Sequence, residues 1–190
     1  TAEILKDNNA KKLKKMVNGY GMSIQALSNH SDSFLIMGPT GKDTDFIFKG
    51  TPEEKIRHGT ESLIRTAQAA NALEVPTVVG YPGVENWGRF FFFPYGEGWS
   101  EYEEQFAERF TPILNKFQEY GARFAIEIHP NSFVYDINTA LRALELVDYH
   151  PALGYNFDPA NTLYLMIDPA VLIDTLKDRI YHVHAKDAEL

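Results

Sequence analysis

The sequence predicts an α/β fold with parallel strands, and it favours a closed (β/α)8 barrel over an open sheet. Strand-like and helical segments alternate through all 190 residues, and no hairpin signal joins two strands. No glycine-rich phosphate loop follows a strand, as a dinucleotide-binding open sheet would require. Polar residues instead gather at the ends of three successive strands, which is where barrels of this kind place their active sites.

The first half of the chain supplies two helices and two strands. Residues 3–18 carry an amphipathic stripe that predicts a helix, and the glycines at 19 and 21 end it. A short strand is expected at 22–27. Thr51 and Glu54 form a capping box that opens a long helix, on which His58 lies off the apolar face and is expected at the surface. The next strand is expected at 77–81.

The second half continues the same alternation. Ser100 and Glu103 predict a second capping box, opening a helix that ends near Gly121. Asp136 and Asp168 are expected to cap two further helices. The remaining strands are expected at 123–129, 154–158 and 180–184, with the two capped helices at 137–147 and 169–176.

Composition excludes several classes of protein. The net charge of −8 argues against a nucleic-acid partner, because phosphate backbones attract basic faces, and the one dense basic run, at 11–15, is expected to be a solvated helix face. With no cysteine, neither a disulfide framework nor a thiolate metal site can form. No apolar run reaches the roughly 20 residues that span a membrane, and the first residues are no signal peptide. We expect a cytoplasmic protein.

Polar side chains share one face of each of the last three strands. Since a strand alternates its faces, apolar residues such as Phe124 and Tyr155 point toward the helices, and the polar residues point into the barrel near its mouth. This inward set comprises Glu127, His129, Asn156, Asp158, His182, His184 and Lys186. Buried carboxylates and imidazoles are costly unless paired or metal-bound, so Glu127, Asp158 and His184 are predicted to hold one divalent ion: Mn, Zn, Co, Fe or Mg.

Simpler explanations exist for each residue taken alone. Glu127 could form a structural ion pair with Lys186. Asp158 precedes a proline and could cap a turn. His182 lies deeper than His184 and is expected to be a core histidine that orients a neighbouring ligand. A single shared site explains all of these residues together.

Three sequence runs carry a resemblance to a known family. They are Glu127-Ile128-His129-Pro130, Asn156-Phe157-Asp158-Pro159 and Asp178-Arg179-Ile180-Tyr181-His182-Val183-His184-Ala185-Lys186-Asp187. In this order they resemble the xylose isomerase-like TIM barrels, and among them the sugar phosphate isomerase/epimerase family. The resemblance covers nearly the whole chain, including Trp99 and Gly121.

The resemblance implies a set of site residues. The family binds one metal through Glu, Asp, His and a second Glu, and the first three fall on Glu127, Asp158 and His184. The second Glu belongs to a last strand that this chain does not contain. We therefore expect residues 1–190 to form a single, incomplete barrel domain that lacks the first strand and the last two, since a closed barrel typically needs about 250 residues.

Other residues are expected near the mouth. His129 and Lys186 are predicted to act on the substrate without binding metal, His129 as a contact and Lys186 by neutralising charge on a substrate oxygen. Asn161 stands where the family often has His, and it is expected to hydrogen-bond a sugar hydroxyl. His30 and Trp87 are further candidates for substrate binding, although a surface loop and a packed loop or subunit contact explain them equally well.

These features predict a metal-dependent isomerase or epimerase of a sugar, sugar phosphate or polyol, working by proton transfer through a metal-stabilised enediolate. One alternative is a lyase or C-glycoside-cleaving subunit on the same barrel, with His129 as base. Another is a non-catalytic sugar-binding barrel. A DNA-repair endonuclease is disfavoured by the acidic charge and by the lack of extra histidines. Oligomeric state, sugar and native metal stay open, a homo-oligomer included.

Overall fold

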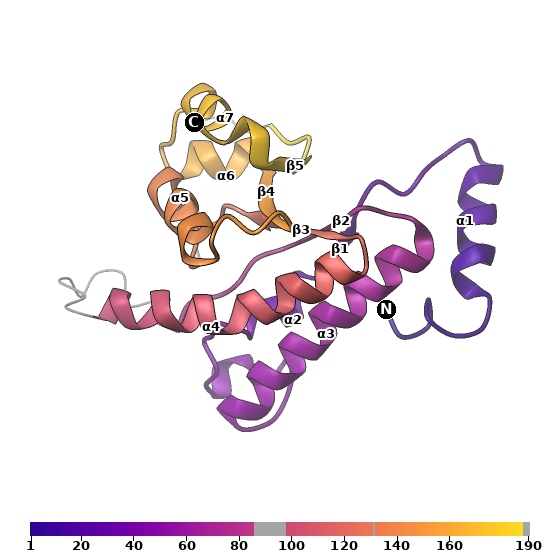
Figure 1. Ribbon diagram of the computed structural model, residues 1–190, viewed down its shortest axis with the longest axis horizontal. Coiled ribbons are helices and arrows are strands. Elements are labelled where there is room, and N and C mark those ends of the chain that lie inside the picture. Colours follow the sequence, from indigo (N-terminus) through magenta and orange to yellow (C-terminus); the bar gives the residue numbers. More distant parts are fainter. Residues whose placement is uncertain (86–97, 131, 188–190) are drawn as a thin grey trace.

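The computed structural model describes residues 1–85, 98–130 and 132–187, and a sheet of five parallel strands forms its centre (Figure 1). These strands are β1 (Leu27–Ser28), β2 (Thr77–Gly80), β3 (Arg123–Glu127), β4 (Leu153–Phe157) and β5 (Ile180–Val183). Their order across the sheet is their order in the chain, and every neighbouring pair is parallel. β5 also approaches β2 across the sheet, so the strands curl into an open half-barrel. The predicted parallel α/β architecture is confirmed.

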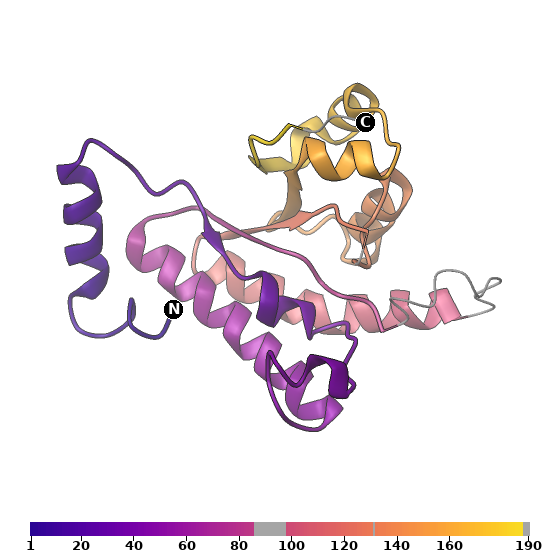
Figure 2. The ribbon, with the colours of Figure 1, turned by 180° about the vertical axis from the view of Figure 1, so that it is seen from behind.

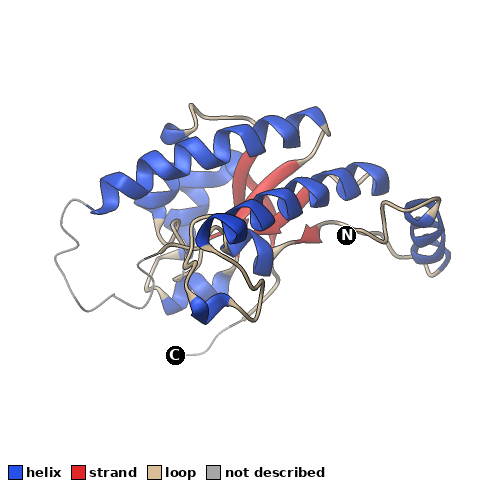
Figure 3. Ribbon diagram, turned by 90° about the horizontal axis from the view of Figure 1, so that it is seen from below, coloured by secondary structure: helices blue, strands red, loops and turns tan. Residues whose placement is uncertain are grey.

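Helices connect the strands and cover the convex side of the sheet (Figure 3). The two longest, α3 and α4, pack side by side, whereas α1 stands at one end of the molecule, as the view from behind also shows (Figure 2). The helices are α1 (Asn9–Gly19), α2 (His30–Phe34), α3 (Pro52–Leu73), α4 (Gly98–Glu119), α5 (Ile137–Leu146), α6 (Pro159–Tyr164) and α7 (Pro169–Leu176), with short 3-10 turns at Lys42–Thr44 and Lys177–Arg179. No helix in the described ranges is long and apolar enough to cross a membrane.

The core lies between the sheet and these helices, which fixes the direction of each strand's side chains. Phe124 on β3 contacts Phe110 and Phe117 of α4, with ring centroids 6.0 and 5.7 Å apart. Tyr155 on β4 is fully buried, and its hydroxyl donates to the Ala140 carbonyl of α5 at 2.5 Å. Because alternate residues point to opposite faces, Glu127 and Asn156 must point away from this core, as predicted.

Several predicted helix starts are confirmed by their hydrogen bonds. Thr51 and Glu54 form the reciprocal capping box of α3. Asp136 caps α5 by accepting from the Thr139 backbone, and Asp168 caps α7 in the same way. Each cap satisfies backbone N–H groups that the helix itself leaves unpaired.

Three predicted element starts lie well away from those in the structure, and the strand predicted at 123–129 already ends at Glu127. The first helix begins at Asn9 and not at residue 3, because Asp7 adopts a left-handed backbone conformation that interrupts a helix. β1 keeps only the last residue of the predicted 22–27 segment, since it is an edge strand that pairs with β2 over two residues. α4 already begins at Gly98, so Ser100 lies inside the helix and not at the predicted N-cap position.

The structure also corrects the prediction for His58 and adds two short helices. His58 is half-buried: its ring stacks on Phe48 at 4.2 Å, and its Nε2 lies 3.3 Å from Asp32 Oδ1. The short helices α2 and α6 follow β1 and β4 directly. α2 can start close to β2 because Gly80 has no side chain, and a Cβ there would lie 2.6 Å from the Asn29 carbonyl oxygen. This close approach sets the position of His30.

Candidate metal centre

Three neighbouring strands deliver the predicted metal ligands to one end of the sheet. In the sheet register, Glu127 of β3 stands beside Asn156 of β4, which stands beside His182 of β5. Asp158 and His184 follow two residues further on and therefore lie on the same face, just beyond the strand ends. This end is the C-terminal mouth of the half-barrel, where (β/α)8 barrels carry their active sites.

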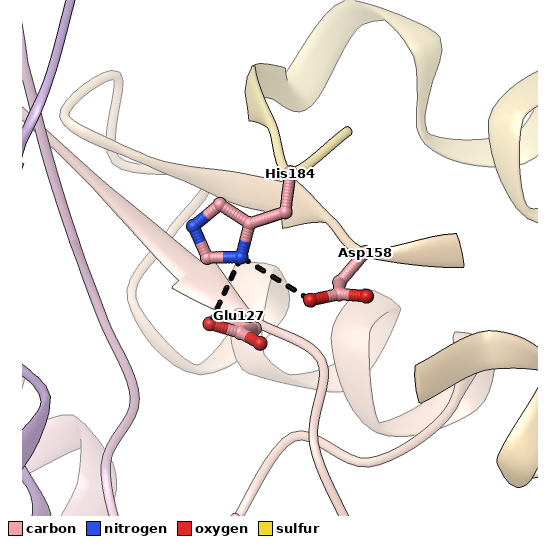
Figure 4. A group of neighbouring side chains, drawn as sticks. All are labelled: Glu127, Asp158 and His184. Carbon is pink, nitrogen blue, oxygen red and sulfur yellow. Dashed lines mark hydrogen bonds and ion pairs between the residues drawn. The ribbon is translucent and has the colours of Figure 1, made fainter. Parts of the chain in front are cut away.

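Glu127, Asp158 and His184 converge at this mouth (Figure 4). His184 Nδ1 lies 3.2 Å from Asp158 Oδ2 and 3.5 Å from Glu127 Oε2. One ligand atom from each residue can be chosen so that all three lie within 4.8 Å of one another. Ligand bonds of about 2.0 to 2.5 Å to a central ion produce separations of this size. The carboxylates are 4% and 1% exposed, so they are poorly solvated.

The donor set fits a divalent cation. The side-chain amide of Asn156 approaches His184 Nδ1 through its nitrogen, at 3.0 Å, and its Oδ1 is buried without a hydrogen-bond partner among the described residues. The role of Nδ1 depends on the ring tautomer, and its single lone pair can meet either the Asn156 N–H or a metal ion, not both at once. Nδ1 also lies close to one oxygen of each carboxylate, so two acidic oxygens and an imidazole nitrogen meet at one point, an arrangement that a cation stabilises. Two oxygens and one imidazole nitrogen suit the first-row divalent ions and Mg²⁺.

Asp158 also caps α6, so the alternative suggested by its following proline is correct as well. Its Oδ1 accepts from the backbone N–H groups of Ala160 and Asn161, at 3.0 and 3.3 Å. The other oxygen, Oδ2, faces His184. A single carboxylate therefore starts a helix with one oxygen and joins the candidate metal site with the other.

Lys186 supplies positive charge beside the two acids. Its ammonium pairs closely with Asp158 Oδ2 and lies 4.0 Å from Glu127 Oε1. Burial by itself would raise the pKa of Asp158. The hydrogen bonds from Lys186 and from the Asn161 backbone lower this pKa by a larger amount, so the pKa of Asp158 lies below its ordinary value. The Asp158 hydrogen bond raises the pKa of Lys186. From the sequence, the alternative role of Lys186 was an ion pair with Glu127. In the structure, the Lys186 ammonium lies nearer to Asp158 than to Glu127.

His30 follows the first strand and reaches the mouth. The sequence left two alternatives for this residue, a place at the mouth and a place in a surface loop, and the structure has the first. Its Nε2 lies 2.8 Å from Glu127 Oε2, and its Nδ1 lies 2.5 Å from the Ser28 hydroxyl. Asn161 lies on the other side of the same carboxylate and donates from Nδ2 to Glu127 Oε1 at 2.8 Å. Both residues, predicted to contact substrate, thus contact Glu127 in the structure.

His129 lies at the mouth but outside the group of converging ligands. Its ring stacks on Tyr81, with centroids 4.7 Å apart and planes at 3°, and Tyr81 also contacts His30 at 5.4 Å. Burial lowers the pKa of His129, against a smaller opposing effect of Glu127, so the imidazole is neutral near pH 7. A neutral imidazole can accept a proton from a substrate.

Sequence reasoning missed two residues of this site. Tyr81, which stacks on His129, follows β2 directly, and that position at a strand end was the available signal. Asn156 was placed on the inward face without a role, and only the structure shows its contact with His184. His182 stays a neighbour of the site, its ring centroid 5.7 Å from that of His184. Trp87 lies outside the described residues.

A profile of the family described as xylose isomerase-like TIM barrel matches residues 2–190. The chain belongs to this family. The predicted family and fold are therefore confirmed. Among curated proteins, the uncharacterized protein YfiH of Bacillus subtilis is 30% identical over 79 residues, which cover 41% of this chain and 25% of YfiH.

Several solved structures share the fold of this chain. The 3-keto-D-glucoside 4-epimerase YcjR of E. coli superposes with a TM-score of 0.73 and 16% identity over 95% of this chain and 65% of YcjR. The IOLI protein, solved with a bound zinc atom, gives 0.61 and 17% over 96% of this chain and 58% of IOLI. The chain therefore spans about a quarter of YfiH and about three fifths of these two structures.

Proposed function

We propose that this protein is a divalent-metal-dependent isomerase or epimerase that acts on a sugar, sugar phosphate or sugar-like polyol. The observation that carries the proposal is the convergence of Glu127, Asp158 and His184 from three adjacent strands. The two buried carboxylates carry more negative charge than the single ammonium of Lys186 balances, and a bound divalent cation would offset it. YcjR is named as an epimerase, IOLI was solved with a bound zinc atom, and both share the fold of this chain. These likenesses support the proposed reaction class and the proposed metal.

The proposed reaction is proton transfer next to a carbonyl. When bound, a divalent ion stabilises negative charge on the substrate oxygens beside the carbon that loses its proton. Glu127 can take that proton, because its carboxylate stands at the mouth and is held on both oxygens by His30 and Asn161. Acyl transfer through a cysteine nucleophile is excluded, because the chain has no cysteine.

Two further residues have proposed roles at the substrate. Lys186 carries a charged ammonium beside both carboxylates, and its proposed role is to neutralise negative charge on a substrate oxygen. The neutral imidazole of His129 is the proposed substrate contact on the Tyr81 side of the mouth. The metal is Mn, Zn, Co, Fe or Mg, and the proposed partner is a small sugar. Trp87 stays a proposed contact with it.

The proposal also concerns the rest of the barrel. We propose that residues 1–190 belong to one domain and that its complete barrel contains further strands beside β1 to β5. The support is that the chain covers 65% of YcjR and 58% of IOLI. In addition, the outer edges of β1 and β5 pair with no other strand in the described ranges. Parallel barrels leave no such edges.

Activity on a panel of keto-sugars and their phosphates tests the function. The purified protein is treated with a chelator, and turnover is measured before and after Mn²⁺ is restored. We expect activity to disappear and return. Glu127→Gln should abolish exchange of the substrate's α-proton with solvent deuterium, whereas Glu119→Gln, which changes an exposed carboxylate of α4, should leave exchange intact.

Four outcomes would contradict the proposal. Unchanged turnover after complete metal removal would exclude a metal-dependent reaction. Full deuterium exchange in Glu127→Gln would exclude Glu127 as the base. Products of bond cleavage would favour a lyase, and sugar binding without turnover would favour a non-catalytic barrel.

A further inference from the structure

The two acidic ligands divide their oxygens in the same way. Glu127 Oε2 and Asp158 Oδ2 face His184 Nδ1, at 3.5 and 3.2 Å, so we call them the inner oxygens. Glu127 Oε1 and Asp158 Oδ1 are the outer oxygens, and both bind α6. A carboxylate at the end of a flexible side chain has no strong rotational preference, so something must select which oxygen faces inward.

Asn161 is the residue that binds both outer oxygens. Its side-chain Nδ2 donates to Glu127 Oε1 at 2.8 Å, and its backbone N–H donates to Asp158 Oδ1 at 3.3 Å. An ionised carboxylate can only accept, so the amide must present its nitrogen to Glu127. One residue of α6 thus ties together acids that come from β3 and from the end of β4.

The other neighbours of Glu127 cannot do the same. His30 binds the inner oxygen, Oε2, which is the oxygen that faces His184. Lys186 lies 4.0 Å from Oε1, and its side chain is 51% exposed, so it restrains the carboxylate weakly. The hydrogen bond from Asn161, at 2.8 Å and on a helix that Asp158 itself caps, is the strongest restraint on the outer oxygen of Glu127.

We propose that Asn161 is a positioning residue that turns the inner oxygens of Glu127 and Asp158 toward the metal, an inference that rests on the proposed function. It acts through Glu127 and does not need to touch the sugar. This role differs from a substrate contact in its consequences. Loss of the amide would weaken metal binding itself, by about tenfold to a hundredfold, as is usual for partners that orient a ligand.

Mn²⁺ affinity of the purified, chelator-treated protein tests this role by isothermal titration calorimetry. Asn161→Leu and Asn161→Ala remove the amide, and both residues suit a helix, so α6 is expected to form in both. Thr162→Val is the matched control: it removes the neighbouring hydroxyl, which bonds the Pro159 carbonyl within α6 and contacts neither carboxylate side chain. The visible absorption spectrum of the Co²⁺ form reports the geometry around the metal.

The proposal predicts a higher Mn²⁺ dissociation constant and an altered Co²⁺ spectrum in both Asn161 variants, with Thr162→Val like the unmodified protein. Equal affinity in all four proteins would overturn the positioning role and leave the metal-dependent function standing. Equal loss in Thr162→Val would also overturn it, because general weakening of α6 would then explain the effect. Absence of Mn²⁺ and Co²⁺ binding in the unmodified protein would overturn the proposed function together with this inference.

Discussion

The ammonium of Lys186 binds Asp158 Oδ2, the same oxygen that lies 3.2 Å from His184 Nδ1. A cation from the side chain thus uses an oxygen that the proposed metal would also use. Lys186 and a metal ion therefore compete for this oxygen, because two cations at one carboxylate oxygen repel each other.

Lys186→Met should therefore raise the affinity for Mn²⁺ while lowering turnover, since the competing charge and its role at the substrate are lost together. Lys177→Met is the control: it removes the same charge from an exposed pair with Asp174. Calorimetric titration of both variants measures the effect. Weaker Mn²⁺ binding in Lys186→Met alone would show that the lysine supports the site and does not compete with the ion.

His129 is expected to act on the substrate and not on the metal, because it lies outside the converging group and stacks on Tyr81. His129→Phe keeps an aromatic ring on Tyr81 and removes both ring nitrogens. We expect kcat to fall by about tenfold, as the loss of one hydrogen bond to the substrate predicts, with little change in metal affinity. A large loss of metal affinity at unchanged kcat would make His129 a ligand.

Tyr155→Phe tests the contact between β4 and α5. The Tyr155 hydroxyl is buried and donates to the Ala140 carbonyl, so its loss should lower the free energy of unfolding by about 1 to 2 kcal/mol in urea titrations. Tyr181→Phe removes a more exposed hydroxyl that bonds the Pro151 carbonyl, and it should cost less. Equal losses in both variants would refute the argument from burial.

His150 should make stability depend on pH. Burial, and then the charge of Arg179, lower its pKa in the folded protein below the ordinary 6.5. Its Nδ1 accepts from the Ala152 N–H at 3.1 Å, which requires the neutral ring. The folded state therefore binds the proton less readily than the unfolded chain, so this stabilisation is complete above pH 6.5 and is lost as pH falls toward the folded pKa.

His150→Asn keeps an oxygen acceptor near the position of Nδ1 and cannot be protonated. Between pH 7 and pH 5 the free energy of unfolding of this variant should fall less than that of the unmodified protein. Parallel stability curves would show that His150 does not contribute. Some dependence should remain, because burial also lowers the pKa of His129 and His182.

Much of the fold and the ligand set could be predicted because simple periodicity determines them. Alternation in β3 separated Phe124 from Glu127, and the structure places one in the core and the other at the mouth. The capping residues Thr51 and Asp136 predicted helix starts because their hydrogen bonds are local in sequence. Such local rules apply before tertiary contacts form.

Long-range contacts could not be predicted in this way. His30 and Glu127 are 97 positions apart, so only the sheet order brings them within 2.8 Å. Asn161 was expected at a sugar hydroxyl, since nothing in the sequence shows that α6 returns its side chain to Glu127. β1 is shorter than its apolar pattern suggested, because pairing with β2 and not propensity sets its length.

The central claim is that Glu127, Asp158 and His184 hold one divalent ion. Its most direct test is an anomalous difference map from a crystal of the protein soaked in Mn²⁺. We expect one strong peak within about 2.0 to 2.5 Å of a carboxylate oxygen from each acid and of His184 Nδ1. A map without a peak among these three residues, in a crystal that binds Mn²⁺ elsewhere or not at all, would contradict it.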